Sequence, residues 1–404
     1  MNDALPLSDA DNRTMGRRHV PSAARSTIPI AKPFLDAAEA EAAREAVLSG
    51  WLSQGAQVSA FEREFAVLTG AGHACAVSNC TTALHLALLA VGVGPGDEVI
   101  TPSHSFIATA NSVRYCGATP IFVDIDPSTF NLDPNCVAEA ITDRTRAILT
   151  VHQMGMPCDL ERLLAVADSN GIPVIEDAAC AIGSQIKMDG AWEYVGKPRG
   201  AVACFSFHPR KVVTTGEGGM LTTADPEIDR KLRLWRQHGM NVPDTVRHGS
   251  AQVIFESYDC VGFNYRMTDI QAAIGRKQLL RLPEIVARRR AIASRYAELL
   301  GEVDGLILPF EPEWVRSNWQ SYCVGLPERV DQKTVMQNLL DQGIATRRGI
   351  MCSHREAPYA NEERRHSLRQ SEFAQDHAIL LPIYVQMTED DQTRVADALR
   401  KELA

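Results

Sequence analysis

The 404-residue sequence predicts an α/β protein with a mostly parallel sheet, followed by a smaller α+β domain. Two observations favour this fold class. Between residues 74 and 207, short apolar segments alternate with helical segments, which is the pattern of parallel strands covered by helices on both faces. Beyond residue 283 the alternation stops and long helical segments dominate. A chain of this length is ample for two domains with large cores.

The expected elements follow from composition and periodicity. Residues 36–49 are rich in Ala and Glu and end at Gly50, and residues 58–68 repeat apolar positions at helical spacing, so both are predicted helices. Further helices are expected at 83–91 and 160–170. The predicted strands are 74–77, 98–101, 119–123, 145–151, 172–176 and 201–207.

Three segments are expected along the chain. Residues 1–27 mix charges, Pro and Ser without periodicity and are predicted to be a flexible tail. Residues 28–285 form the predicted large domain, and residues 286–404 the smaller one, after a break near Pro283. The small domain is expected to contain helices at 288–300, 333–342 and 388–403, the last begun by a capping box of Thr388 and Asp391.

Charge and cysteine usage limit the partners and the compartment. The sequence has 41 Lys+Arg against 50 Asp+Glu, a net charge of −9, which argues against nucleic acids and anionic membranes as general partners. The ten cysteines are dispersed without a Cys-x-x-Cys pair, so no zinc site is indicated and reduced thiols are expected. Neither a signal peptide nor a membrane-spanning run is recognisable, and the protein is expected to be cytoplasmic.

The first candidate site opens the helix after the first strand. Residues 78–82 place Cys80, Thr81 and two further hydroxyls at a helix N-terminus, where free backbone N–H groups suit a phosphate. The alternative is ordinary N-capping of this helix by a threonine.

The second candidate site ends the strand at residues 172–176. Glu176 and Asp177 are adjacent, so their side chains alternate in direction and only one faces a pocket. A buried carboxylate requires a cation or a donor, and Asp177 could hold a heterocyclic nitrogen in its protonated form. The alternative is a carboxylate that caps a strand-to-helix turn.

The third candidate is Lys211, which follows the strand at 201–207 and precedes a glycine-rich loop at 214–219. Burial there would lower its pKa and make the amine a nucleophile for Schiff-base formation; the alternative is a surface lysine. The loop is not a Walker A motif, and no G-x-G-x-x-G is present. Together the three sites match what a protein supplies to pyridoxal 5′-phosphate (PLP), in the chain order of fold-type-I PLP enzymes.

The motifs then identify a resemblance. From about residue 28 to its end, the sequence resembles the DegT/DnrJ/StrS family of PLP-dependent sugar aminotransferases. The stretches that carry the resemblance are 49–55, 84–88, 94–99, 117–120, 123–124, 206–208 with Lys211, 215–219, 264–269 and 348–351.

The resemblance implies specific roles at the cofactor ring. Lys211 would form the Schiff base and move the proton during transamination. Asp177 would pair with the pyridine nitrogen, and Phe106 would stack on the ring. Cys180 stands near the cofactor's 3′-oxygen, where the family often has Gln or His; a thiol is a weaker donor. Relatives that dehydrate sugars replace the lysine with His, so Lys211 favours amino transfer.

The resemblance also implies a phosphate site shared between subunits. Cys80, Thr81 and Ser206 would hold the cofactor phosphate from one subunit. Asn264 would reach the phosphate of the neighbouring subunit, which implies a homodimer with shared active sites. An amide can donate to a phosphate oxygen, but nothing in the sequence itself indicates an interface.

Four residues are candidates for substrate contact: Trp51, His152, Arg348 and His354. For His152 a structural role is an equally good interpretation, and for the others a role in a loop is the alternative. The run at 288–290 is three arginines, which are interpreted as a solvated helix face.

The function implied is transfer of an amino group from an amino acid, with glutamate expected, to a nucleotide-linked keto-sugar in amino-sugar and polysaccharide biosynthesis. Two alternatives stay open. One is amination of a keto-inositol or another keto-polyol, and the other is a PLP-fold regulator without catalysis. The presence of both Lys211 and Asp177 argues against the regulator.

Overall fold

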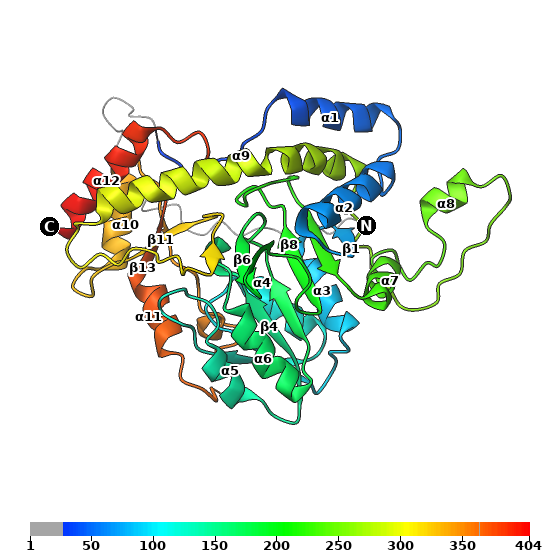
Figure 1. Cartoon of the computed structure of the whole chain (residues 1–404), viewed down its shortest axis with the longest axis horizontal. Helices are drawn as coiled ribbons and strands as arrows, with labels where there is room; N and C mark the ends of the chain where they lie inside the picture. Colours follow the sequence, from blue (N-terminus) through cyan, green and yellow to red (C-terminus); the bar gives the residue numbers. More distant parts are fainter. Residues whose placement is uncertain (1–26, 363) are drawn as a thin grey trace, which may run out of the picture.

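A central seven-stranded sheet organises the computed structural model, which describes residues 27–362 and 364–404 (Figure 1). The predicted tail at 1–27 lies outside the described residues except for Thr27. Among the described residues, no helix has both the length and the apolar composition needed to cross a membrane.

The strand order of this sheet is β1-β9-β8-β5-β4-β2-β3. Strand β9 pairs antiparallel with both neighbours, and the pairs from β8 to β3 are parallel, so the predicted mostly parallel sheet is confirmed. β9 begins at Gly219, the last residue of the stretch interpreted from the sequence as a glycine-rich loop, and no strand is predicted over the rest of it. The bounds are β1 His73–Val77, β2 Glu98–Pro102, β3 Thr119–Val123, β4 Thr145–Val151, β5 Val174–Asp177, β8 Val202–Ser206 and β9 Gly219–Thr223.

Helices cover both faces of the sheet because successive strand residues point to opposite sides. Val202 and Cys204 of β8 pack in the hydrophobic cluster formed with α3, α4 and α7, whereas Ala203 and Phe205 pack against α2 and α9. The bounds are α1 Ala37–Leu48, α2 Ala56–Thr69, α3 Cys80–Ala90, α4 Ile107–Tyr115, α5 Pro134–Ala140, α6 Leu160–Asn170 and α7 Pro226–Trp235.

One long helix, α9 (Asp269–Leu300), runs from the central sheet to the C-terminal elements (Figure 1). It passes through Pro283 without interruption, so the predicted break there and the predicted helix start at residue 288 are wrong. Leu282 packs in the cluster under the sheet, and Tyr296 packs in the C-terminal cluster. Burial on both sides of the proline offsets its cost to a helix interior, about 3 kcal/mol.

The C-terminal elements surround their own hydrophobic cluster. The capping box of Thr388 and Asp391 is confirmed at the start of α12. Because α9 crosses residues 285 and 286, the domain boundary placed there stays a prediction. The bounds are β11 Tyr322–Gly325, α10 Gln332–Asp341, β12 Arg347–Arg348, α11 Arg369–His377, β13 Ala378–Leu381 and α12 Glu389–Leu403, with a small sheet of β10 Val315–Arg316, β6 Gln185–Met188 and β7 Ala191–Tyr194.

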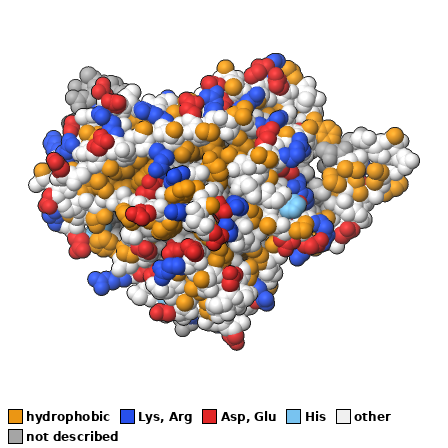
Figure 2. All heavy atoms as spheres, viewed as in Figure 1, with side chains coloured by type: hydrophobic (Ala, Val, Ile, Leu, Met, Phe, Trp, Pro, Cys, Tyr) orange, Lys and Arg blue, Asp and Glu red, His pale blue; other side chains and the backbone are white. Residues whose placement is uncertain are grey.

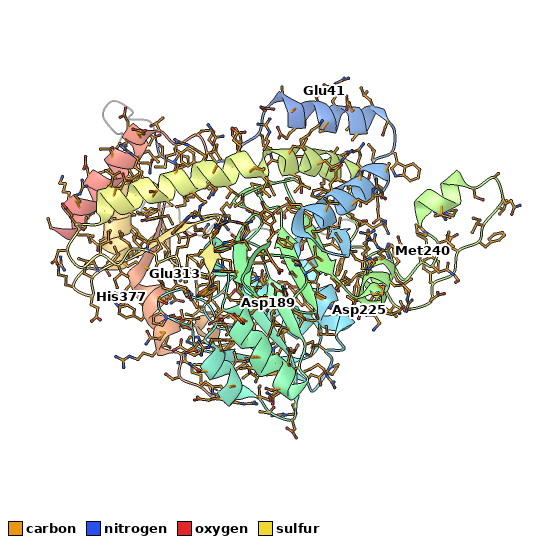
Figure 3. The ribbon with its side chains drawn as sticks, viewed as in Figure 1. Glu41, Asp189, Asp225, Met240, Glu313 and His377 are labelled. Carbon is orange, nitrogen blue, oxygen red and sulfur yellow. The ribbon has the colours of Figure 1, made fainter. Side chains whose placement is uncertain are left out.

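An arm of residues 240–262, which includes α8 (Asp244–Gly249), projects away from the body of the molecule (Figure 1). Met240 marks its base in Figure 3. Hydrophobic side chains gather on the arm (Figure 2), and those of Val253, Phe255 and Val261 are 84%, 90% and 88% exposed.

Candidate active site

Asp177 ends β5 at the carboxyl edge of the sheet, where parallel α/β sheets bind ligands. The Thr109 hydroxyl donates to Oδ2 at 2.9 Å, and the backbone N–H of Ala179 donates to Oδ1 at 3.1 Å. Burial raises the pKa of Asp177 above its ordinary value, and the Thr109 hydrogen bond opposes that rise. Glu176 instead accepts the hydrogen bonds of other groups, so only one of the two adjacent carboxylates faces this site.

Lys211 lies next to Cys180, with Nζ 3.1 Å from Sγ. Desolvation alone would lower the pKa of Lys211, but interactions with Cys180 and then Asp177 leave this pKa above its ordinary value. The expectation that burial depresses the pKa of Lys211 is therefore wrong for the protein without its cofactor. The acidic groups around the amine decide the direction, and they hold the side chain as an ammonium.

The N-terminus of α3 presents free donors to the same region. Asn79 caps this helix, because its side chain accepts from Thr82 N at 2.9 Å and the Thr82 hydroxyl bonds back to Asn79. The cap is therefore an asparagine rather than the threonine of the alternative interpretation. The backbone N–H groups of Cys80 and Thr81 have no acceptor within the described part of the chain.

Glycine makes room for a close approach at this helix start. A Cβ on Gly219 of β9 would lie 2.6 Å from the backbone of Asn79 and 2.9 Å from the nitrogen of Cys80. Ser206, the last residue of β8, pairs with Gly219 in the sheet. The same corner of the sheet edge thus contains Cys80, Ser206 and the open backbone donors. Burial raises the pKa of the Cys80 thiol, so this thiol is neutral.

These residues fit the PLP that the sequence resemblance implies. The helix start offers N–H donors to a phosphate, and a buried carboxylate at Asp177 suits a protonated ring nitrogen. Lys211 Nζ lies 3.1 Å from the Sγ of Cys180, which follows Asp177 by three residues, so the amine approaches the chain just beyond this carboxylate. Phe106 precedes α4 and is 62% exposed, so its ring is open to contact. Asn264 is exposed, beside the base of the arm.

His152 is 1% exposed, with both ring nitrogens engaged. The backbone N–H of Cys158 donates to Nδ1 at 3.0 Å, and Nε2 lies 2.9 Å from Glu176. Its side chain therefore holds the end of β4 against β5, and the structure favours the structural interpretation over substrate contact.

The other three substrate candidates have different local surroundings. His354 is 2% exposed and bonds to Ser103 at 2.6 Å and to Glu372 at 3.0 Å. Arg348, in β12, is exposed. The Trp51 indole donates to Gln54 O at 3.0 Å, within the loop between α1 and α2.

Two residues that contact the site, Thr109 and Asn318, are not predicted from the sequence. Thr109 lies one helical turn after Phe106, and this spacing could have indicated that it faces the same edge. Asn318 donates to the carbonyl of Cys180 at 2.8 Å from an irregular segment far along the chain, and no local pattern indicates that contact.

Comparisons with known proteins agree with this geometry. Residues 33–400 match the model of the DegT/DnrJ/EryC1/StrS aminotransferase family. The GDP-perosamine synthase of Caulobacter vibrioides is 41% identical over 379 residues, 92% of this chain and 97% of that protein. The spore coat polysaccharide biosynthesis protein SpsC of Bacillus subtilis is 38% identical over 382 residues, 92% and 96% of the two chains.

A solved structure gives the same result for the fold. The PLP form of the sugar aminotransferase Spr1654 from Streptococcus pneumoniae superposes with a TM-score of 0.85 at 26% identity, over 93% of this chain and 98% of that chain.

Proposed function

The chain belongs to the DegT/DnrJ/EryC1/StrS family and is a PLP-dependent sugar aminotransferase, and from that premise we propose its reaction. It moves the amino group of an amino acid to a keto-sugar carried on a nucleoside diphosphate, for polysaccharide synthesis. The expected amino donor is glutamate. The name of the GDP-perosamine synthase supports a nucleotide-linked sugar as the substrate, and the name of SpsC supports a role in polysaccharide biosynthesis. The observation that carries the proposal is the convergence of Lys211, Asp177 and the open α3 N-terminus.

PLP, when bound, supplies an electron sink that stabilises the carbanion formed at the amino-acid α-carbon. In the proposed site, Cys80, Thr81 and Ser206 hold the phosphate and Asp177 faces the ring nitrogen. The Lys211 amine would take the α-proton of the donor and return a proton when the sugar receives the nitrogen. Phe106 covers one face of the ring and excludes water.

We also propose that the active enzyme is a homodimer with shared sites. The side chains of Val253 and Phe255 on the apolar arm are almost fully exposed to solvent. Exposed apolar side chains that lie together are typical of an interaction surface. Asn264 lies at the base of this arm, exposed and polar. A second copy of the chain that covers the arm would receive Asn264 beside its own phosphate site.

The test is an amination assay by mass spectrometry on nucleotide-linked 3- and 4-keto-sugars, with a keto-inositol as competitor and glutamate as donor. We expect glutamate-dependent amination of a nucleotide-linked sugar and none with Lys211→Ala. Amination of the keto-inositol alone would contradict the substrate class, and no amination with any acceptor would indicate the regulator instead.

The same assay tests the shared site. Asn264→Ala and Lys211→Ala proteins, each deficient alone, are mixed under conditions that exchange subunits. If Asn264 acts across the interface, hybrid dimers contain one complete site and the mixture regains up to about a quarter of wild-type activity. A mixture no more active than its components would place Asn264 and Lys211 in the same subunit's site.

A further inference from the structure

An irregular segment of residues 317–320, before β11, contacts the loop that carries Cys180. Asn318 is fully buried, and its side-chain amide donates to the carbonyls of Cys180 and Ile182, both at 2.8 Å. Its backbone N–H donates to the Ser184 hydroxyl at 2.9 Å. The path of the loop after β5 is therefore fixed by a residue from the C-terminal half of the chain.

The same segment also holds the chain beside the reactive lysine. Gln320 Nε2 donates to the carbonyl of Arg210 at 2.8 Å, immediately before Lys211. Gln320 N in turn donates to Asn318 Oδ1 at 2.8 Å. One short segment thus binds the backbone next to both partners of the contact between Lys211 Nζ and Cys180 Sγ.

Two further contacts keep the segment in place. Arg289 of α9 is 4% exposed and donates to Trp319 O at 2.9 Å and to Gln320 O at 2.6 Å. The interpretation of residues 288–290 as a solvated helix face is therefore wrong at its central arginine. The absence of a side chain at Gly155 leaves the space that Asn318 occupies, because a Cβ on Gly155 would lie 2.0 Å from Asn318 Oδ1.

We propose that Asn318 and Gln320 are positioning residues, which set the separation of the Lys211 amine from the Cys180 thiol. The proposal rests on the proposed function, in which Lys211 is the reactive amine. Beyond Cys180, the amine faces Asp177 of β5 and Cys80 of α3. If the segment releases Arg210, the amine and the thiol separate, and the balance of charge around the amine changes.

The sharpest test is Gln320→Glu, which is nearly isosteric. Its carboxylate still accepts the hydrogen bond that the Ser321 hydroxyl gives to Oε1 at 2.8 Å, but cannot donate to Arg210. The matched control is Gln332→Glu, because Gln332 donates to the carbonyls of Gln375 and Ala378, away from the lysine. Thermal unfolding of both proteins establishes that they are folded.

The readouts are the pH titration of the visible absorbance of the PLP-loaded protein and the kinetics. We expect Gln320→Glu to shift the titration midpoint and lower kcat about tenfold, with a smaller change in KM. Gln332→Glu should do neither, and Gly155→Ala, which displaces Asn318, should shift the midpoint independently. A wild-type midpoint in both Gln320→Glu and Gly155→Ala would overturn the proposal.

A second measurement separates this proposal from the proposed function. The rate at which iodoacetamide alkylates Cys180 is followed by peptide mass spectrometry in the protein without PLP. Gln320→Glu should change this rate by about threefold or more, since the reactivity of a thiol follows the charge beside it. An unchanged rate contradicts the positioning role, whereas failure of wild-type protein to bind PLP contradicts only the proposed function.

Discussion

At the scale of single residues, the Asp177 carboxylate depends on one hydroxyl. Burial raises the pKa of Asp177, and the Thr109 hydrogen bond is the largest influence that lowers it. The charged carboxylate is the form that can pair with a protonated ring nitrogen, so Thr109 keeps that form populated at lower pH. The hydroxyl thus acts on the cofactor site without touching the cofactor.

Replacement of Thr109 by valine should therefore shift the pH profile. Without the hydroxyl the pKa of Asp177 rises further, so the carboxylate is lost at a higher pH as the solution is acidified. We expect the acidic limb of kcat/KM to move upward by about half a unit to one unit.

The matched control is Ser112→Ala on the same helix, whose buried hydroxyl donates to Thr109 O at 2.8 Å rather than to Asp177. Equal shifts in Thr109→Val and Ser112→Ala would show that loosening of α4, rather than the lost hydrogen bond, is responsible.

The residues that sequence reasoning located are those with local signals. Lys211 and Asp177 each follow an apolar strand, and the edge rule for parallel sheets then brings them together. Asn318 and Gln320 have no such signal, because irregular backbone carries them to the lysine. The sequence alone does not decide the role of His152, because a histidine after a strand has the same pattern whether it faces substrate or, as here, a buried glutamate.

At the scale of elements, strands and helices were predictable where one period dominates. The strands at 119–123 and 145–151 agree with β3 and β4, and the helix at 160–170 agrees with α6. No strand is predicted at β9, because its first residue, Gly219, ends a glycine-rich stretch that is typical of a loop. In the structure Gly219 instead allows close packing against α3. Pro283 suggested a helix end, but two separate cores hold α9 on either side of it.

Helix α11 depends on an element remote in the sequence. Its own N-cap residue, Leu368, makes no side-chain cap. Asp124, which follows β3, supplies the cap by accepting from Gln370 N and Ser371 N, both at 2.8 Å, and from the Ser371 hydroxyl at 2.7 Å. This carboxylate therefore ties the C-terminal region to the edge of the central sheet.

Asp124→Ala should accordingly lower the free energy of unfolding by about 2 kcal/mol, because three donors lose a charged acceptor. Chemical denaturation with a constant m-value is the measurement. Asp331→Ala, which removes an exposed cap that α10 receives from its own sequence, should cost less. Equal losses in the two variants would contradict the larger stabilising contribution of the remote cap.

At the scale of the whole molecule, the net charge of −9 opposes the binding of an anionic cofactor and an anionic sugar nucleotide. Local groups must overcome that field, and the open N–H groups at α3 are placed to do so. The fold that assembles them was predictable from the alternation of strands and helices. The apolar arm was not, since exposure is a property of the folded chain.

The central claim is that Lys211 carries the cofactor, and identifying the modified lysine tests it most directly. The PLP-loaded protein is reduced with borohydride, which fixes the cofactor to the amine that holds it, and is then digested and mapped by mass spectrometry. We expect the reduced pyridoxyl group on Lys211, with none on this peptide after Lys211→Ala. Attachment to another lysine in the wild-type protein, or to none, would contradict it.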